Sequence, residues 1–439
     1  MQNHPLSRRS LLKGAASLAA LAGVAGSLPA ASTAVRRPRK VQPGEKLNIA
    51  CVGCGGKGQT DVEAMAGENI VALCDVDWSK AKRVAQQYPD VPKFQDYRVM
   101  LRELDERIDA VTVTTPDHMH FPIAKMAIEM GKHVYVQKPL THTVWEARQL
   151  AELARRHGVA TQMGNQGQAE EGVRVLCEYV GSGAIGPVRE VQVWTNRPIW
   201  PQGIERPKET PPVPATLNWD LWLGVAPARP YHPAYHPFKW RGWFDFGTGA
   251  LGDIGCHSFA PIQRALKLGP PSSVEAVSSP LAKEAFPLAS IVRYQFPARG
   301  DLPPVKLTWY DGGLKPERPA ELEADRTLGE GGTIFVGDKG VIYNGRLLPE
   351  SRMHAQPPPP RTLPRSPGHY QEWLLACKGG EPAGSNFDIA GPQAETILLG
   401  NIALRTQKRL LWDAENLRIT NVPDANEQLR PRYREGWDV

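Results

Sequence analysis

Acidic side chains are missing from the first 40 residues of this 439-residue chain. The same segment contains seven positive side chains, namely Arg8, Arg9, Lys13, Arg36, Arg37, Arg39 and Lys40. The formal net charge of the whole chain is +6, so residues 41–439 together carry only −1. A protein that attracts nucleic acid through its charge needs an excess of cations on its folded domains. The charge distribution therefore excludes a nucleic-acid partner of that kind.

Long hydrophobic runs are also missing. The uncharged stretch at residues 14–28 would rise only about 22 Å as a helix, which is less than the roughly 30 Å of a bilayer core. We therefore expect no stable membrane span after processing. The Arg8-Arg9 pair before this stretch resembles a twin-arginine signal, whose route exports folded proteins. We predict a signal and linker over residues 1–40, cleavage near residues 30–34 and a periplasmic location, with an ordinary secretory leader as the alternative.

Cysteine is scarce, with six residues in the chain. Cys51 and Cys74 fall in apolar runs typical of buried strands, and Cys177 falls in a helix-like segment, so we expect reduced core thiols rather than disulfides. Cys51 and Cys54 have the spacing of a redox or zinc pair, but no second pair follows them. We predict no metal site.

Two different hydrophobic patterns divide the rest of the chain. From Leu47 to residue 163, short β-branched runs alternate with amphipathic segments, which predicts a parallel sheet covered by helices on both faces. After residue 165, longer strands with alternating polarity follow one another, which predicts a mainly antiparallel open sheet. The expected fold class is an α/β domain at 45–165 followed by an α+β domain at 166–439.

A glycine-rich turn follows the first predicted strand. Gly53, Gly55 and Gly58 have Gly-x-Gly-x-x-Gly spacing and lead into a helix, which is typical of a Rossmann dinucleotide-binding domain. The second strand ends at Asp75, 20 residues after Gly55, where a carboxylate can accept hydrogen bonds from both ribose hydroxyls. A carboxylate there would repel a 2′-phosphate, so the sequence predicts NAD rather than NADP. The alternative is that the glycines only permit a tight turn and that Asp75 caps a strand.

Four further segments resemble the Gfo/Idh/MocA family of glucose-fructose oxidoreductase and inositol dehydrogenase. They are TTPDHMH at 114–120, VQKPL at 136–140, GDIGCHS at 252–258 and the closing SNFDIAGPQAETILLGNIALRT. The resemblance implies an NAD-dependent oxidoreductase in which Lys138, Asp253 and His257 are catalytic. It also implies a homo-oligomer, a dimer or a tetramer.

The chemistry of these three residues agrees with that role. Lys138 lies between a buried strand and Pro139, and a lysine in a dry pocket beside a positive ring should lose proton affinity. Asp253 and His257 are four residues apart and share one face if their segment is helical, so we expect Asp253 to orient His257 as a proton acceptor. A surface amine, a helix cap and an incidental histidine are the structural alternatives.

Three positions depart from the pattern of relatives. Gln137 stands where Glu is usual, Ala260 where Asp is common, and Gln168 where exported relatives often carry His. These departures leave the substrate and the proton route open.

The expected binding residues form two sets. For the cofactor we expect Gly53, Gly55, Gly56, Lys57, Gly58, Asp75, Thr114, Thr115, Pro116, His120, Gln137, Lys138 and Asn165. For the substrate we expect Lys138, Trp194, Tyr235, Trp240, Asp253 and His257. Six of the 12 tryptophans fall between residues 194 and 243, and flat rings beside polar groups suit a sugar, although each ring could instead fill core.

Export and the cofactor together constrain the reaction. Nicotinamide nucleotides are cytoplasmic, so we expect NAD to be tightly bound before export and regenerated in place. The main hypothesis is hydride transfer with a carbinol carbon of a sugar or polyol. A redox-neutral glycosidase, lyase or epimerase that forms a transient keto-sugar is the first alternative, and a non-catalytic nucleotide- or sugar-binding protein is the second.

Overall fold

The computed structural model describes residues 35–437, so most of the predicted signal lies outside the described residues. The first sheet has six parallel strands in the order β3-β2-β1-β4-β5-β6. Its strands are β1 (Asn48–Val52), β2 (Asn69–Cys74), β3 (Lys93–Phe94), β4 (Ala110–Val113), β5 (His133–Val136) and β6 (Thr161–Met163). Every residue of β4, β5 and β6 is buried, as expected for a sheet with helices on both faces.

Helices cross between these strands. They are α1 (Lys57–Ala64), α2 (Lys82–Gln87), α3 (Tyr97–Glu103), α4 (His120–Glu129) and α5 (Val144–His157). Helix α5 has clear boundaries in the sequence, because Thr143 and Glu146 form a capping box and Gly158 ends the helix in the left-handed conformation. The strand order places the ends of β1 and β4 side by side at the centre of the sheet, where a ligand crevice forms in doubly wound folds.

The second sheet has nine strands in the order β13-β12-β11-β7-β10-β9-β8-β14-β15. They are β7 (Val188–Trp194), β8 (Ser273–Ser278), β9 (Ser290–Phe296), β10 (Val305–Tyr310), β11 (Gly332–Gly337), β12 (Gly340–Tyr343), β13 (Arg346–Leu348), β14 (Leu410–Asp413) and β15 (Arg418–Ile419). All neighbouring pairs are antiparallel except β7 and β10. The predicted fold class is confirmed, with a parallel Rossmann sheet followed by a mainly antiparallel one.

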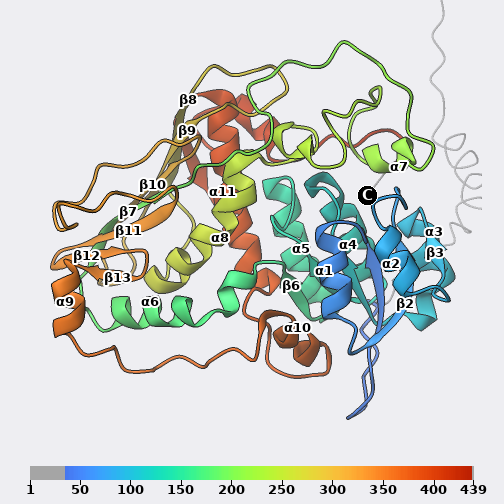
Figure 1. The fold of residues 1–439 in the computed structure, drawn as a ribbon, viewed down its shortest axis with the longest axis horizontal. Helices are drawn as coiled ribbons and strands as arrows, with labels where there is room; N and C mark the ends of the chain where they lie inside the picture. Colours follow the sequence, from blue (N-terminus) through green and yellow to red (C-terminus); the bar gives the residue numbers. More distant parts are fainter. Residues whose placement is uncertain (1–34, 438–439) are drawn as a thin grey trace, which may run out of the picture. The chain divides into compact units, whose positions relative to one another are not determined.

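The helices of the second half are α6 (Glu171–Gly181), α7 (Trp219–Leu223), α8 (Gly249–Leu266), α9 (Glu350–Ala355), α10 (His369–Cys377) and α11 (Phe387–Thr406). Helices α8 and α11 lie between the second sheet and the helices of the first half (Figure 1). Helix α11 packs against α5, and Trp373 of α10 packs against Tyr135 of β5. The core of the first sheet is therefore completed by residues from the end of the chain.

The six cysteines are free, and all are buried except Cys177, which is partly exposed. Burial raises the pKa of the Cys51 thiol to about 12, so this thiol stays protonated at neutral pH. No helix within residues 35–437 has the length and apolarity needed to cross a membrane.

Candidate active site

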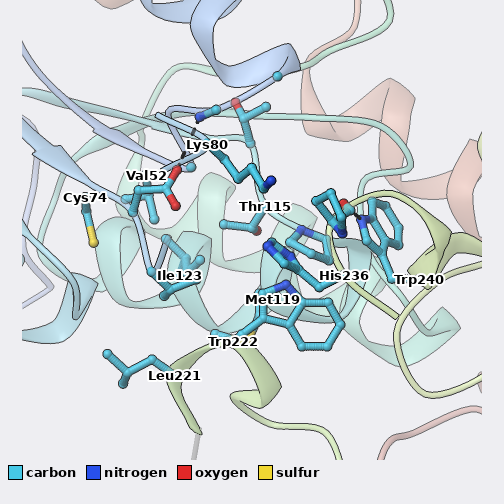
Figure 2. Close-up of a pocket in the computed structure, with 18 of the residues that line it drawn as sticks. Val52, Cys74, Lys80, Thr115, Met119, Ile123, Leu221, Trp222, His236 and Trp240 are labelled. Atoms are coloured by element: carbon cyan, nitrogen blue, oxygen red, sulfur yellow. Dashed lines mark hydrogen bonds between the residues drawn. The ribbon is translucent and has the colours of Figure 1, made fainter. Parts of the chain in front are cut away.

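A cavity of about 430 Å³ lies at the carboxyl ends of β1, β2, β4 and β5. Figure 2 shows Val52 and Cys74 at one side of it, Thr115 and Met119 near the middle, and His236 and Trp240 at the other side. The predicted cofactor residues that line this cavity are Gly53, Gly55, Gly56, Lys57, Asp75, Thr114, Thr115, Pro116, Gln137 and Lys138. Of the predicted substrate residues, Lys138 and Trp240 line it.

The glycine turn brings β1, β4 and α1 into direct contact. Gly53 has φ of +78°, and a Cβ atom there would overlap the carbonyl of Thr114. A Cβ atom on Gly58 would overlap the carbonyl of Gly53, so this glycine packs inside the turn and does not line the cavity. The close approach places the start of α1 at the cavity wall, where its free N–H groups can meet a phosphate.

Asp75 is anchored by backbone N–H groups. Its Oδ2 accepts hydrogen bonds from the amides of Cys54 (2.8 Å) and Gly55 (3.2 Å), and its Oδ1 accepts one from Asp77 (2.9 Å). Burial raises the pKa of Asp75, and the three N–H donors oppose that rise. A carboxylate offers about four acceptor positions, so Asp75 retains the capacity to accept from a ribose hydroxyl.

Asp61 of α1 is a buried carboxylate that the sequence analysis missed. Its Oδ1 accepts hydrogen bonds from Lys57 and from the hydroxyl of Tyr370 (2.7 Å). Its Oδ2 accepts from the hydroxyl of Thr114 and the side-chain amide of Gln137, both at 2.8 Å. Three of these four donors belong to residues that line the cavity, namely Lys57, Thr114 and Gln137. Asp61 therefore holds these side chains in place from outside the cavity.

Lys138 and Asp253 form an ion pair at the far side of the cavity. The Lys138 Nζ atom lies 2.9 Å from Asp253 Oδ1 and donates to the backbone carbonyl of Asp253 at 2.8 Å. Arg241 Nε donates to the same Oδ1 at 3.1 Å. Burial alone would raise the pKa of Asp253, but the charges of Lys138 and Arg241 outweigh it and hold that pKa below its usual value.

His257 is oriented by Asn165, whereas the sequence analysis expected Asp253 to orient it. The side-chain N–H of Asn165 donates to the carbonyl of Cys256 at 2.8 Å, which leaves Asn165 Oδ1 to accept from His257 Nδ1 at 2.9 Å. This arrangement fixes the tautomer, because a neutral ring with hydrogen on Nδ1 has a lone pair on Nε2. Burial and then the charge of Lys138 lower the pKa of His257 to about 4.

Asp253 and His257 lie on α8, one helical turn apart. Neither residue lines the cavity directly, but Asp253 contacts two cations that do. Asn165, which was expected to bind the cofactor, is fully buried beneath His257.

Asp117 is a second carboxylate that the sequence analysis missed. It is buried in the short helical turn Asp117–Met119 that precedes α4, and its Oδ2 accepts a hydrogen bond from the hydroxyl of Thr248 at 2.7 Å. Burial raises its pKa to about 7, and the neighbouring charge of Asp253 contributes to the rise. The motif TTPDHMH contains this residue, but its role depends on Thr248, which is 131 positions away.

Three predicted site residues lie elsewhere. His120 is fully buried, with its ring nitrogens 2.8 Å from the carbonyl of Pro139 and 2.9 Å from that of Thr115. The indole of Trp194 donates to the carbonyl of Gly329 within the second sheet. The ring of Tyr235 packs in an aromatic core and does not reach the cavity. Composition alone could not distinguish these core aromatics from Trp240.

Two buried polar atoms of cavity-lining residues have no partner among the described residues. They are Thr115 Oγ1 and His236 Nδ1, and the other ring nitrogen of His236 lies 3.0 Å from Asp77. Buried polar atoms without partners are rare in folded proteins. Together with the glycine turn and Asp75, they fit a cleft built around a polar, hydroxyl-bearing ligand such as a dinucleotide.

A Rossmann sheet with a glycine turn and a lysine at the end of its cleft defines a class, the dinucleotide-dependent oxidoreductases with a second α/β domain. Residues 47–165 match the family model described as "Oxidoreductase family, NAD-binding Rossmann fold", and residues 188–296 match the model of its "C-terminal alpha/beta domain". The chain belongs to this Gfo/Idh/MocA oxidoreductase family.

Curated relatives cover parts of the chain. A "Glycosyl hydrolase family 109 protein" of Saccharopolyspora erythraea is 31% identical over 43% of this chain and 45% of its own length. The "Inositol 2-dehydrogenase" of Burkholderia multivorans is 32% identical over 32% of this chain and 43% of its own length. The chain thus spans about half the length of the curated relatives that it matches.

Solved structures share the fold over most of the chain. The WlbA dehydrogenase from Bordetella pertussis, solved with NADH and UDP-GlcNAcA, has a TM-score of 0.59 at 18% identity, covering 84% of this chain and 99% of its own. A levoglucosan dehydrogenase solved with NADH and levoglucosan has a TM-score of 0.56 at 16% identity, with the same coverage. At these identities the likeness shows the fold alone.

Proposed function

We propose that this protein is an NAD-dependent oxidoreductase that transfers hydride between its cofactor and a carbinol carbon of a sugar or polyol. The observation that carries the proposal is the placement of Asp75 and the Lys138–Asp253 pair at opposite ends of one cavity. Asp75 follows β2 and Lys138 follows β5, with β1 and β4 between them, so about 14 Å separates the two strands. A dinucleotide whose ribose is held by Asp75 would extend toward Lys138.

The residues at this end have separate tasks. Lys138 donates a hydrogen bond to the reacting oxygen of the substrate, and Asp253 holds the ammonium group in place. His257 lies on α8 one helical turn from Asp253, and it would accept the hydroxyl proton through Nε2, whose lone pair is maintained by Asn165. When bound, the nicotinamide would supply the hydride acceptor.

The test uses protein purified without added nucleotide. Released small molecules are identified by mass spectrometry, and the near-ultraviolet absorbance of reduced nicotinamide is followed while single sugars and polyols are added. We expect bound NAD and a signal with at least one sugar. Lys138→Ala should abolish the signal, while Lys125→Ala, which removes only a surface pair with Glu129, should retain it. No signal with any sugar or polyol would contradict the proposal.

A redox-neutral reaction is the second candidate. It is supported by the names of three matched relatives, each called "Glycosyl hydrolase family 109 protein". Hydride that is removed and later returned would permit elimination or epimerisation at a neighbouring carbon. In the same experiment, a transient absorbance signal with a cleaved or epimerised product would favour this candidate, whereas a stable signal with an oxidised product would favour net oxidation.

Retention of the cofactor is proposed together with export. The support is the Arg8-Arg9 signal pattern, because a folded-protein route allows NAD to leave the cytoplasm inside the enzyme. Replacing both arginines with lysine should keep the protein in the cytoplasm with its cofactor still bound. A homo-oligomer is also proposed, supported by the family resemblance, and light scattering of the purified protein would test it.

A further inference from the structure

Arg241 lies at the edge of the cavity in a short helical turn, Lys239–Gly242. Aromatic rings surround its guanidinium group, with centroid distances of 4.2 Å to Trp240, 4.6 Å to Phe238 and 5.9 Å to Trp200. Its Nε donates to Asp253 and its Nη1 donates to the carbonyl of Phe238 at 3.1 Å. The group is therefore held in one orientation before any ligand arrives.

The Nη2 end of this guanidinium group has no hydrogen-bond partner among the described residues. The side chain retains 22% of its exposure and lines the cavity, so this end can reach a ligand there. A guanidinium N–H group donates a strong, charge-assisted hydrogen bond to a carboxylate, and Nη2 carries two such N–H donors.

Positive charge exceeds negative charge around Arg241. One carboxylate, Asp253, contacts both Lys138 and Arg241. Burial raises the pKa of the nearby carboxyl of Asp117 to about 7, so this group offsets positive charge less than an exposed carboxylate would. This end of the cavity thus carries an excess of positive charge within the described part of the chain.

The other carboxylates of the cavity are engaged elsewhere. Asp75 accepts backbone N–H groups at the end of β2, and Asp96 accepts hydrogen bonds from Arg98. Two partly buried cations that share one carboxylate leave an excess of positive charge, and a ligand that brings an anion offsets that excess.

We propose that the substrate is an acidic sugar and that Arg241 binds its carboxylate. The inference rests on the proposed function and narrows it to sugar acids such as uronates. The indole of Trp240 stacks on the guanidinium group and so helps to hold Arg241 at the cavity. Arg241 is then the residue that selects charged over neutral substrates.

The test measures binding separately from turnover. NAD-loaded protein is titrated with matched neutral and acidic sugars, D-glucose with D-glucuronate and D-galactose with D-galacturonate, and also with D-glucose 6-phosphate. Tryptophan fluorescence reports binding, because Trp200 and Trp240 flank Arg241. We expect the acid of at least one pair to bind about 10- to 100-fold more tightly than its neutral partner, as for a charge-assisted hydrogen bond.

Variants identify the residue responsible. Arg241→Gln should bring the acidic sugar to within about threefold of the neutral one. Arg241→Lys, which keeps the charge but not the planar group, should retain part of the preference. Arg189→Gln is the matched control, because Arg189 forms an exposed pair with Asp338 in the second sheet and should leave the preference unchanged.

Three results would overturn the inference. They are equal or tighter binding of the neutral sugar in both pairs, a preference for the acid that survives in Arg241→Gln, and tighter binding of the phosphate than of either carboxylate. Failure of the proposed function would give a different result. Acidic sugars would still bind selectively through Arg241, but their addition would produce neither an absorbance signal of reduced nicotinamide nor an altered product.

Discussion

At the scale of single residues, the hydrogen bonds of Asp61 explain an unusual residue next to Lys138. Gln137 stands where the resemblance leads one to expect Glu, and its amide N–H donates to Asp61 Oδ2 at 2.8 Å. A glutamate at this position would place two carboxylates in contact inside a buried site. The neutral amide is therefore the form that Asp61 requires.

This reasoning predicts the result of a paired exchange. Asp61→Asn should weaken NAD binding at least tenfold and lower the free energy of unfolding by about 2–3 kcal/mol, because one amide cannot accept from four donors. Gln137→Glu should have a similar effect through repulsion. The double variant restores one donor and one acceptor. Its loss in free energy of unfolding should therefore be smaller than the sum of the losses in the two single variants.

Calorimetric titration with NAD and urea unfolding would measure these effects. Glu63→Gln, a change of a more exposed carboxylate on the same helix, is the control and should alter neither quantity. If the losses in free energy of unfolding caused by Asp61→Asn and Gln137→Glu simply added in the double variant, that result would contradict a direct contact between the two side chains.

The pH dependence of turnover tests the state of His257. Its pKa is lowered to about 4, first by burial and then by Lys138, so the ring remains neutral and able to accept a proton well below pH 6.5. The titration of His257 should therefore lower kcat/KM only as the pH approaches about 4, since this ratio reports the essential groups before substrate binds. Asp117, whose pKa burial raises to about 7, can add a second inflection near neutral pH.

Asp117→Asn separates the two groups by removing that second inflection. An inflection near pH 6.5 that persists in Asp117→Asn would show that His257 titrates like an exposed histidine.

At the scale of elements, the contact between α1 and the end of β1 depends on Gly58. A methyl group there would overlap the carbonyl of Gly53 and push the start of α1 away from the strand. Gly58→Ala should therefore reduce NAD affinity at least tenfold and destabilise the protein by about 1–3 kcal/mol.

Gly67→Ala is the matched control, because a Cβ atom at Gly67 would meet nothing within 4 Å. Titration with NAD and thermal unfolding of both variants would compare them. An equal response to the two changes would show that the close packing at Gly58 is unimportant.

Elements that depend on local patterns could be predicted from the sequence. The alternation of strands and helices, the glycine turn and the position of Asp75 directly after β2 all follow from residues close together in the chain.

Side-chain partners far apart in the sequence could not be predicted. Asn165 contacts a histidine 92 positions away, and Asp61 contacts Tyr370, 309 positions away. Trp194 and Trp240 are both buried in core clusters, and only the packing of the second domain places Trp240 also against the cavity.

At the scale of the whole molecule, α5 and α11 connect the two sheets. Arg148 of α5 donates two hydrogen bonds to Glu395 of α11, at 2.7 and 2.8 Å, and Glu395 is buried. A double-mutant cycle with Arg148→Ala and Glu395→Ala should give a coupling energy of about 1–2 kcal/mol in urea unfolding.

The same cycle on the exposed pair Arg189 and Asp338 should give a value below about 1 kcal/mol. Equal coupling in both pairs would show that burial adds nothing to the contact between the two helices.

The hydrogen bond from Tyr370 to Asp61 has a consequence for synthesis of the protein. Domains begin to fold as the chain leaves the ribosome, starting from the amino terminus. The glycine turn and Asp75 emerge early, but Tyr370 and Trp373 belong to the last fifth of the chain and complete the wall behind them. Nucleotide that enters before then meets an unfinished site, so durable capture must wait until translation is almost over.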